Sequence, residues 1–227
     1  MHLLFILLQT EVTLPEATRK EYSLSLLDLA IKGGWVMIPI FLLLLYAIYI
    51  FIERYLSLNR LGKVDDKFVT TVCSAIEQGD ARNALNLTRA QSTAISRILE
   101  KGILRLGSPI NEIESGMENQ SKVETGRMEE GVGTLGAIAA LAPMFGFLGT
   151  VFGMIQAFSN IAVSDNLSIG VISEGIYTKM VTSAAGLIVG IIAHSLYLVI
   201  NAQLDKRLQQ IEIAANEFVD FLYQPRK

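Results

Sequence analysis

The apolar residues of this chain are concentrated in three long stretches that contain no charged side chain. These stretches cover residues 35–52, 131–164 and 180–204. A helix needs about 20 apolar residues to cross the hydrocarbon core of a membrane, so each stretch is long enough to span. The second stretch exceeds that length and must tilt or extend beyond the hydrocarbon. The pattern therefore predicts three transmembrane helices.

The polar segments between and after these stretches also follow a helical pattern. Apolar residues recur every three or four positions in residues 76–87 and 95–106, and again in the tail, where Leu208, Ile211 and Phe218 share one face. Ser108 and Pro109 are typical of a helix start. Because no proline follows until Pro143, we expect one helix of about 75 Å over residues 110–161, with the amphipathic tail packed beside it.

This pattern predicts an all-α membrane protein with three transmembrane helices and long cytoplasmic helical extensions. The expected division of the chain is an N-terminal periplasmic or interfacial segment (1–32), transmembrane helix 1 (33–55), a cytoplasmic helical domain (56–130), transmembrane helix 2 (131–163), a periplasmic hairpin (164–179), transmembrane helix 3 (180–204) and a C-terminal cytoplasmic helix (205–227). The apolar start of the chain lacks a basic region and a nearby cleavage site, so we expect it to be retained.

The distribution of Lys and Arg around the three stretches predicts the orientation in the membrane. Eight such residues follow the first stretch, precede the second or follow the third, whereas four lie on the opposite side. Since basic residues accumulate on the cytoplasmic side, the N-terminus is predicted to lie outside the cytoplasm, with the segment 53–130 and the C-terminus in the cytoplasm.

Composition supports a membrane protein and argues against several other classes. The mean hydropathy is +0.43, and the net charge of −3 includes no basic run that would predict nucleic-acid binding. A single cysteine, Cys73, excludes an internal disulfide. We find no phosphate-binding loop and no zinc-protease motif. We therefore expect no enzymatic activity, no cofactor and no metal site.

Small residues form one face on each of the last two predicted membrane helices. Such faces allow helices to approach closely in lipid, so helix packing is the simplest interpretation. Pro143 is expected to kink the second helix. The candidate packing residues are Pro143, Gly146, Gly149 and Gly153 on the second helix and Gly186 and Gly190 on the third.

Hydroxyl groups and ionisable groups accompany these faces. Membrane Ser and Thr commonly bond to their own backbone, but their clustering on small-residue faces also suits the lining of a hydrated cavity. Lys179 fits snorkelling at the outer interface. His194 fits either a neutral imidazole held by a hydroxyl or a proton relay. The candidate ion-pathway residues are Thr150, Glu174, Thr178, Thr182 and Ser183.

Three motifs resemble those of the ExbB/TolQ/MotA family of channel-forming subunits, and most closely its ExbB branch. They are GGWVMIP with a following Glu-Arg pair in the first helix, LAPMFGFLGTVFGMIQAF in the second and GIYTKMVTSAAGLIVGI in the third. The resemblance covers nearly the whole chain. It implies a homopentamer in a bacterial inner membrane, around the single transmembrane helix of an ExbD/TolR-type partner that carries a membrane aspartate.

The resemblance also implies a function and a role for some residues. Ion flow would power a TonB-type energy transducer, and Thr150 and Ser183 would be the pore hydroxyls of the second and third helices. The family's third-helix glutamate corresponds to Thr178, and Lys179 follows it, so Glu174 is a candidate substitute one turn outward. A TolQ-like or gliding-type motor, a sodium-driven one and a scaffold that conducts nothing remain alternatives.

Overall fold

The structure is a computed structural model that describes residues 33–163 and 169–223, without the side chains of Asp66, residues 169–172, Glu174 and Thr178. The N-terminal segment predicted over residues 1–32 lies outside the described residues. All regular secondary structure in the described residues is helical. The helices are α3 (Met37–Leu61), α4 (Asp66–Glu77), α5 (Ala81–Ala90), α6 (Ala94–Ile103), α7 (Ile110–Glu129), α8 (Val132–Val163) and α9 (Ile169–Tyr223).

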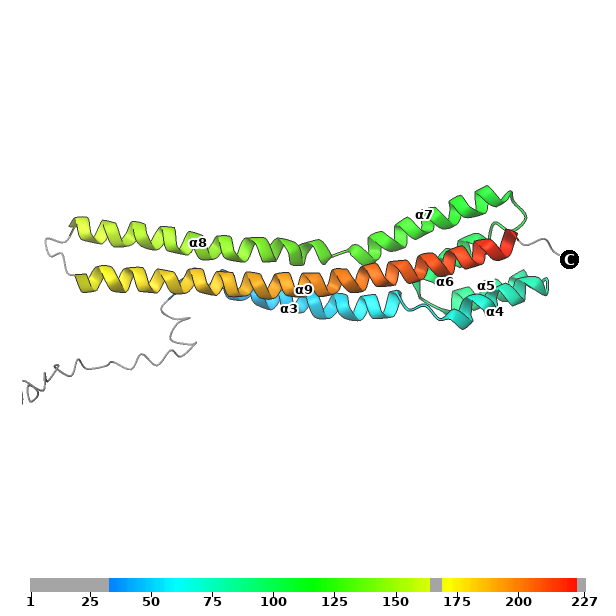
Figure 1. The fold of residues 1–227 in the computed structure, drawn as a ribbon, viewed down its shortest axis with the longest axis horizontal. Coiled ribbons are helices and arrows are strands. Elements are labelled where there is room, and N and C mark those ends of the chain that lie inside the picture. The colour runs from blue at the N-terminus through cyan, green and yellow to red at the C-terminus, as the bar shows by residue number, and fades with distance from the viewer. Residues whose placement is uncertain (1–32, 164–168, 224–227) are drawn as a thin grey trace, which may run out of the picture.

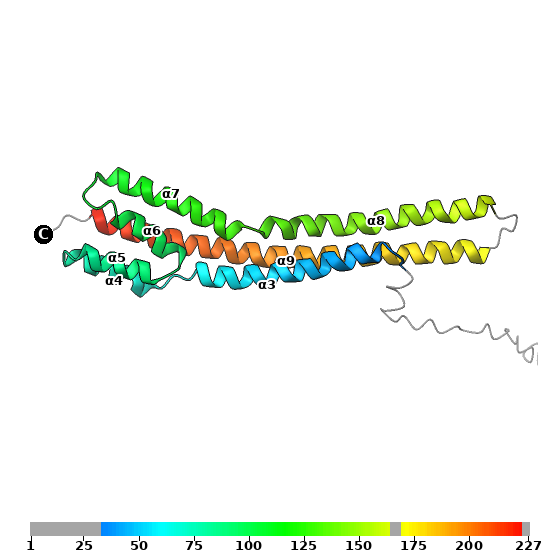
Figure 2. The same cartoon turned by 180° about the vertical axis from the view of Figure 1, so that it is seen from behind.

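The helices form an elongated molecule with two parts (Figure 1). We call α3, α8 and the first part of α9 the shaft, and α4 to α7 with the last part of α9 the head. Helix α9 has 55 residues and runs through both parts. In Figure 1, α3 passes behind α9, and in the reverse view of Figure 2 it lies in front. One side of the α8/α9 pair is therefore covered by α3 and the other is free.

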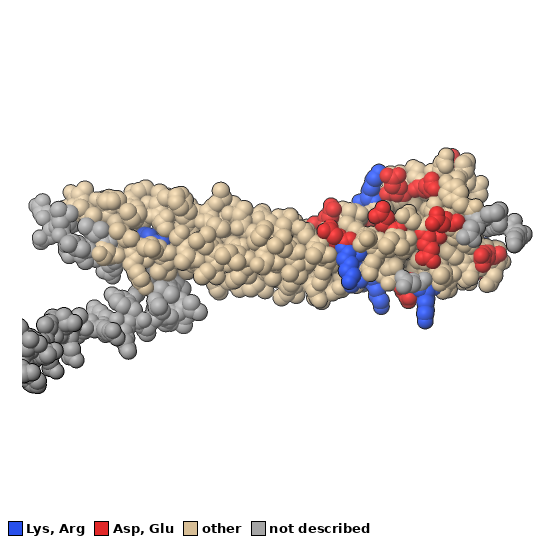
Figure 3. All heavy atoms as spheres, viewed as in Figure 1, with Lys and Arg blue, Asp and Glu red and all other residues tan. Residues whose placement is uncertain are grey.

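The three predicted membrane helices are confirmed by length and composition. Helix α3, the α7–α8 stretch and α9 from Lys179 onward are each long and apolar enough to cross a membrane. Only 17–28% of the residues in their most apolar windows are buried inside the chain, so most of this apolar surface faces outward. Figure 3 shows the charged groups gathered on the head, while the shaft is almost free of them.

The structure corrects two continuous helices that the sequence predicts. The helix expected over residues 110–161 is interrupted between α7 and α8, because Gly131 has a φ of +76° and ends the helical path. The segment 76–87 is likewise divided at Gly79, with φ of +78°, and α5 restarts after the Asp80 N-cap. In addition, Pro109 is the N-cap of α7 rather than its first helical residue.

The core of the head confirms the predicted packing of the amphipathic tail. Ile211 and Phe218 of α9 are buried among residues of α6 and α7, including Ile98, Leu99 and Met117. Helix α9 contacts both α6 and α7, so the tail packs beside the segment that precedes the second membrane helix. The hairpin predicted over 164–179 is partly helical, because α9 already begins at Ile169.

Candidate functional site

Helices α8 and α9 approach most closely where two glycines face each other. A Cβ added to Gly146 would lie 3.1 Å from the Cα of Gly186 and 3.1 Å from the carbonyl oxygen of Ser183. A Cβ added to Gly186 would lie 2.6 Å from the carbonyl oxygen of Ala142. These neighbours are backbone atoms and cannot rotate away. The two helices therefore pack backbone against backbone, as small-residue faces permit in membranes.

The other predicted packing residues extend this contact along the shaft. Gly190 leaves room for the ring of Pro143, since a Cβ there would lie 2.6 Å from the proline Cγ. Gly149 leaves room for Thr182, whose Oγ1 would lie 3.2 Å from an added Cβ. The start of α3 closes the same place, because Val36 also packs on Gly149.

Thr182 belongs to this interior packing. Its side chain is fully buried, and its hydroxyl donates a hydrogen bond of 2.8 Å to the carbonyl oxygen of Lys179. Gly33, just before α3, also packs on its methyl group. The structure thus places Thr182 between three segments of the shaft, although the sequence grouped it with the ion-pathway candidates.

Thr150 and Ser183 lie on the free side of the α8/α9 pair. Gly149 of α8 contacts Thr182 of α9 on the side near α3. Thr150 is the next residue after Gly149, and Ser183 is the next residue after Thr182. Because the helices are antiparallel, this one-residue step turns both side chains toward the same side, away from α3. We call this side, with Thr150 and Ser183 at one level, the hydroxyl face. Both residues are partly exposed.

Thr150 is bonded within its own helix and borders an apolar hollow. Its hydroxyl donates a hydrogen bond of 2.6 Å to the carbonyl oxygen of Phe147. The hollow is shallow and is lined, besides Thr150, by Val151, Met154, Ile155 and Phe158. The hydroxyl oxygen retains lone pairs that can accept a hydrogen bond or contact a cation.

Lys179 packs against α8 rather than extending freely from α9. Its Cγ, Cδ and Cε atoms fill the space in which Gly153 lacks a side chain, and the residue is partly buried. Lys179 precedes Ser183 by four residues, so it lies about 6 Å farther out on the same face. Gly153 therefore packs against a lysine side chain, not against the backbone of α9.

His194 lies on the exposed surface of α9, eleven residues after Ser183 and therefore on the same face. Its ring stacks on Tyr197 with centroids 6.1 Å apart. Tyr197 in turn lies over Gly136 of α8, where an added Cβ would be 3.4 Å from its ring. The other two ion-pathway candidates, Glu174 and Thr178, are on α9, but their side chains lie outside the described residues.

Comparison with known proteins connects this arrangement to a family. Residues 90–213 match the family described as the MotA/TolQ/ExbB proton channel family. This match contains α7, α8 and the close contact between α8 and α9. The chain belongs to the MotA/TolQ/ExbB family.

Relatives within the family carry ExbB names. The chain is 30% identical over 191 residues to a putative biopolymer transport protein ExbB homolog of Methanothermobacter thermautotrophicus, covering 83% of this chain and 67% of the relative. It is 31% identical over 203 residues to the putative ExbB-like protein 1 of Synechocystis, covering 88% and 79%. A biopolymer transport protein ExbB of Neisseria gonorrhoeae matches 91 residues at 34% identity, 40% of this chain and 41% of the relative. Membership of this family and the three apolar helices establish a membrane location.

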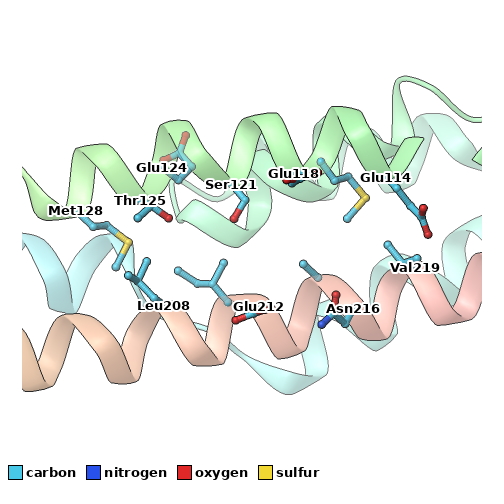
Figure 4. Close-up of a pocket in the computed structure, with 13 residues that line it drawn as sticks. Glu114, Glu118, Ser121, Glu124, Thr125, Met128, Leu208, Glu212, Asn216 and Val219 are labelled. Carbon is cyan, nitrogen blue, oxygen red and sulfur yellow. The ribbon is translucent and has the colours of Figure 1, made fainter. Parts of the chain in front are cut away.

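The head of this ExbB-family protein contains a groove that sequence patterns did not indicate. A cavity of about 470 Å³ lies between α7 and the last part of α9. Figure 4 shows side chains of both helices around it, with Glu114 and Glu118 from α7 and Glu212 from α9. Tyr223 is hydrogen-bonded to Glu114, and this bond raises the pKa of the tyrosine. The pKa of Glu118 is lowered by its hydrogen bond and charge pairing with Lys122.

A buried carboxylate lies at the inner end of this groove. The side chain of Glu124 is 2% exposed and accepts hydrogen bonds from Arg97 (2.6 Å) and Arg127 (3.1 Å). It also accepts a bond of 2.8 Å from Gln120. Sequence analysis missed this network. The available signal was that Glu124 lies seven residues after the buried Met117, on the apolar face of α7.

The described residues contain no group of three or more His, Cys, Asp or Glu arranged to hold a metal ion. Cys73 of α4 lies near Glu77 and Glu217 in a groove against α9. Burial, reinforced by these two carboxylates, raises the pKa of its thiol from 9.0 to about 11. A thiol of this kind is a poor nucleophile at neutral pH.

Proposed function

We propose that this chain is the channel-forming subunit of an ion-driven motor complex in a bacterial inner membrane. The complex would couple the proton motive force to a partner that spans the periplasm, and its role is transport rather than catalysis. The observation that carries this proposal is the hydroxyl face. Thr150 and Ser183 lie at one level on the free side of the closely packed α8/α9 pair, in a shaft with almost no charged groups.

The geometry suits a conduit formed between several copies of the chain. A single α8/α9 pair offers one wall, and its close backbone contact keeps the two hydroxyls at a fixed separation. The outward-facing apolar surface of the shaft requires lipid or other helices to cover it. Five copies around a central pore, with their hydroxyl faces inward, would satisfy both requirements. This proposal includes a periplasmic N-terminus and a cytoplasmic C-terminus.

The partner in this proposal is an ExbD/TolR-type subunit whose single helix carries a membrane aspartate. The chain itself has no Asp or Glu between Gly131 and Val163 and none in α9 between Lys179 and Leu204. The names of its relatives favour the biopolymer-transport branch of the family. We therefore propose energisation of TonB-dependent outer-membrane transport, ahead of a TolQ-like or gliding-type stator.

The experiment is ion flux through the purified complex in proteoliposomes, with sodium and pH varied independently. The double variant T150V/S183A removes both hydroxyls with little change of volume, and we expect it to lose ion flux while assembling normally in the membrane. Ser195 provides the matched control, because its hydroxyl is also on α9 but lies twelve residues after Ser183, which turns it about 120° away from the hydroxyl face. The variant S195A should conduct like the wild type.

Three outcomes of this experiment would change the proposal. Normal flux in T150V/S183A would remove the hydroxyl face from the ion path. Flux that depends on sodium at fixed pH would replace the proton by sodium, for which hydroxyl and carbonyl oxygens are suitable ligands. A complex that assembles and conducts no ion under any condition would support a membrane scaffold.

A further inference from the structure

The groove between α7 and α9 in the head is lined by carboxylates that have no basic partner. Of the described residues that line it, none is Lys or Arg. Glu124 is paired with two arginines outside the groove, and Glu118 is paired with Lys122. Glu114 and Glu212 form no ion pair with another described residue. Figure 4 shows these two carboxylates on opposite helices, so the groove presents negative charge from both sides.

Apolar side chains follow one face of α9 through the same groove. Leu208, Ala215 and Val219 are partly exposed there and recur at helical spacing. Met117 and Met128 of α7 also line the groove and are almost fully buried. Methionine is flexible and polarizable, so a surface that rests on it can adapt to the side chains of a ligand.

The length of the groove indicates the kind of occupant. On α7 it extends from Glu114 to Met128, which is about 21 Å along the helix axis. This distance corresponds to about 14 residues of an α-helix. Grooves with an apolar stripe recognise amphipathic helices through side chains spaced every three or four residues. A small organic cation would leave most of the apolar stripe uncovered.

A second copy of this chain offers no suitable helix in its described head. Helix α5 contains Arg82 and Arg89, but its Ala84 is buried in the chain's own core and Arg89 is paired with Glu100. Helices α4 and α6 likewise contribute their apolar residues to that core. The occupant is therefore expected to belong to another protein.

We propose that this groove binds a basic amphipathic helix of a partner protein. Apolar side chains of the partner would contact Leu208, Ala215 and Val219. Lys or Arg side chains beside them would pair with Glu114 and Glu212. The inference goes beyond the proposed ion path, because every residue that lines the groove is in the head. It assigns the head a recognition role of its own.

The test measures peptide binding to the full chain in a neutral detergent by fluorescence anisotropy. The first labelled peptide has about 18 residues, enough to form a helix, with Leu every three or four positions and Lys beside them. A second peptide has Glu in place of Lys, and a third has the composition of the first without its helical period. The wild-type chain should bind the first peptide about tenfold more tightly than either of the others.

Charge variants test whether the peptide binds in this groove. E114Q/E212Q keeps the shape of both side chains and should weaken binding about fivefold, as expected for two exposed ion pairs. E114K/E212K should instead prefer the Glu peptide, a gain that a folding defect cannot produce. The matched control is E112Q/E217Q, which removes one exposed glutamate from each of the same helices outside the groove and should bind like the wild type.

Equal affinity of the wild type for the three peptides, or unchanged binding in E114Q/E212Q, would overturn the inference. Loss of binding in E112Q/E217Q would also overturn it and would assign the peptide to the neighbouring groove between α4 and α9, which Glu217 lines. Tight binding of spermidine, with no preference among the peptides, would assign the groove to a small cation instead.

A chain that ends at Tyr223 tests whether the groove is occupied by the chain's own basic end, which contains Arg226 and Lys227. This variant should bind the first peptide with the affinity of the full chain. A gain in affinity would show that these two residues compete for the groove, and would overturn the inference in favour of the chain's own tail.

Discussion

The substitution Gly186→Ala tests whether the contact between α8 and α9 is as close as the structure shows. A Cβ at this position would lie 2.6 Å from the carbonyl oxygen of Ala142 and 2.8 Å from the Cα of Gly146. An ordinary contact requires 3.4 Å or more, so the two helices would have to separate by about 0.8 Å. Both neighbours are backbone atoms, so no side-chain rotation can relieve the overlap.

The expected size of the effect follows from two opposing terms. Overpacking a close contact costs about 1–3 kcal/mol. Alanine is the better helix former and offsets up to about 1 kcal/mol of this cost. The net loss of about 1–2 kcal/mol corresponds to a Tm lower by roughly 2–8 °C for a protein of this size. The measurement is the fraction of chain that remains monodisperse in detergent after heating, compared with wild type.

Two other glycines provide matched controls for Gly186. A Cβ added to Gly126 in α7 or to Gly133 in α8 would meet nothing within 4 Å. These variants retain the helix preference of alanine without the overlap, so their Tm should be unchanged or higher. If G186A shifted the Tm in the same direction and by the same amount as G126A and G133A, the close approach of α8 and α9 would be refuted.

Two further predictions concern the head. E124A should lower the free energy of unfolding of the head by about 3 kcal/mol, because Arg97 would be left without its buried carboxylate. The double variant R97M/E124M should recover most of that loss in urea unfolding, and no recovery would argue against the pair. Cys73 should react with iodoacetamide roughly 100-fold more slowly at pH 7 than an unperturbed thiol, because burial raises its pKa from 9.0 to about 11. The reaction rate should still be rising above pH 9, where the rate of a free thiol levels off. A plateau of the rate near pH 9 in the folded protein would show that the thiol is not buried.

Much of the shaft could be predicted from the sequence because its signals are local. A run of apolar residues between charged ones specifies a membrane helix wherever it is in the fold, since no other structure except a closed barrel satisfies the backbone in lipid. The interruption at Gly131 was missed because a glycine is tolerated inside helices as well as at their ends. Its φ of +76° depends on how α7 and α8 meet, beside the side chain of Arg54 in α3.

The candidate site was predictable in its residue types and not in its partners. The small faces on the second and third membrane helices followed from spacing, and the pairing of Gly146 with Gly186 is consistent with them. Which glycine meets which residue depends on the register between α8 and α9. That register is a long-range property, because one helical turn of sliding changes every pair without altering either sequence pattern.

The sequence by itself determined the class of this protein: three membrane helices, a helical head, and membership of a channel family carried by its motifs. Only the tertiary structure decided the use of individual side chains. It buried Thr182 between three segments, left Thr150 and Ser183 on the free side, and laid Lys179 across Gly153. The physical reason is that hydropathy and helical period act within one segment, whereas the exposure of a side chain depends on which other segment covers it.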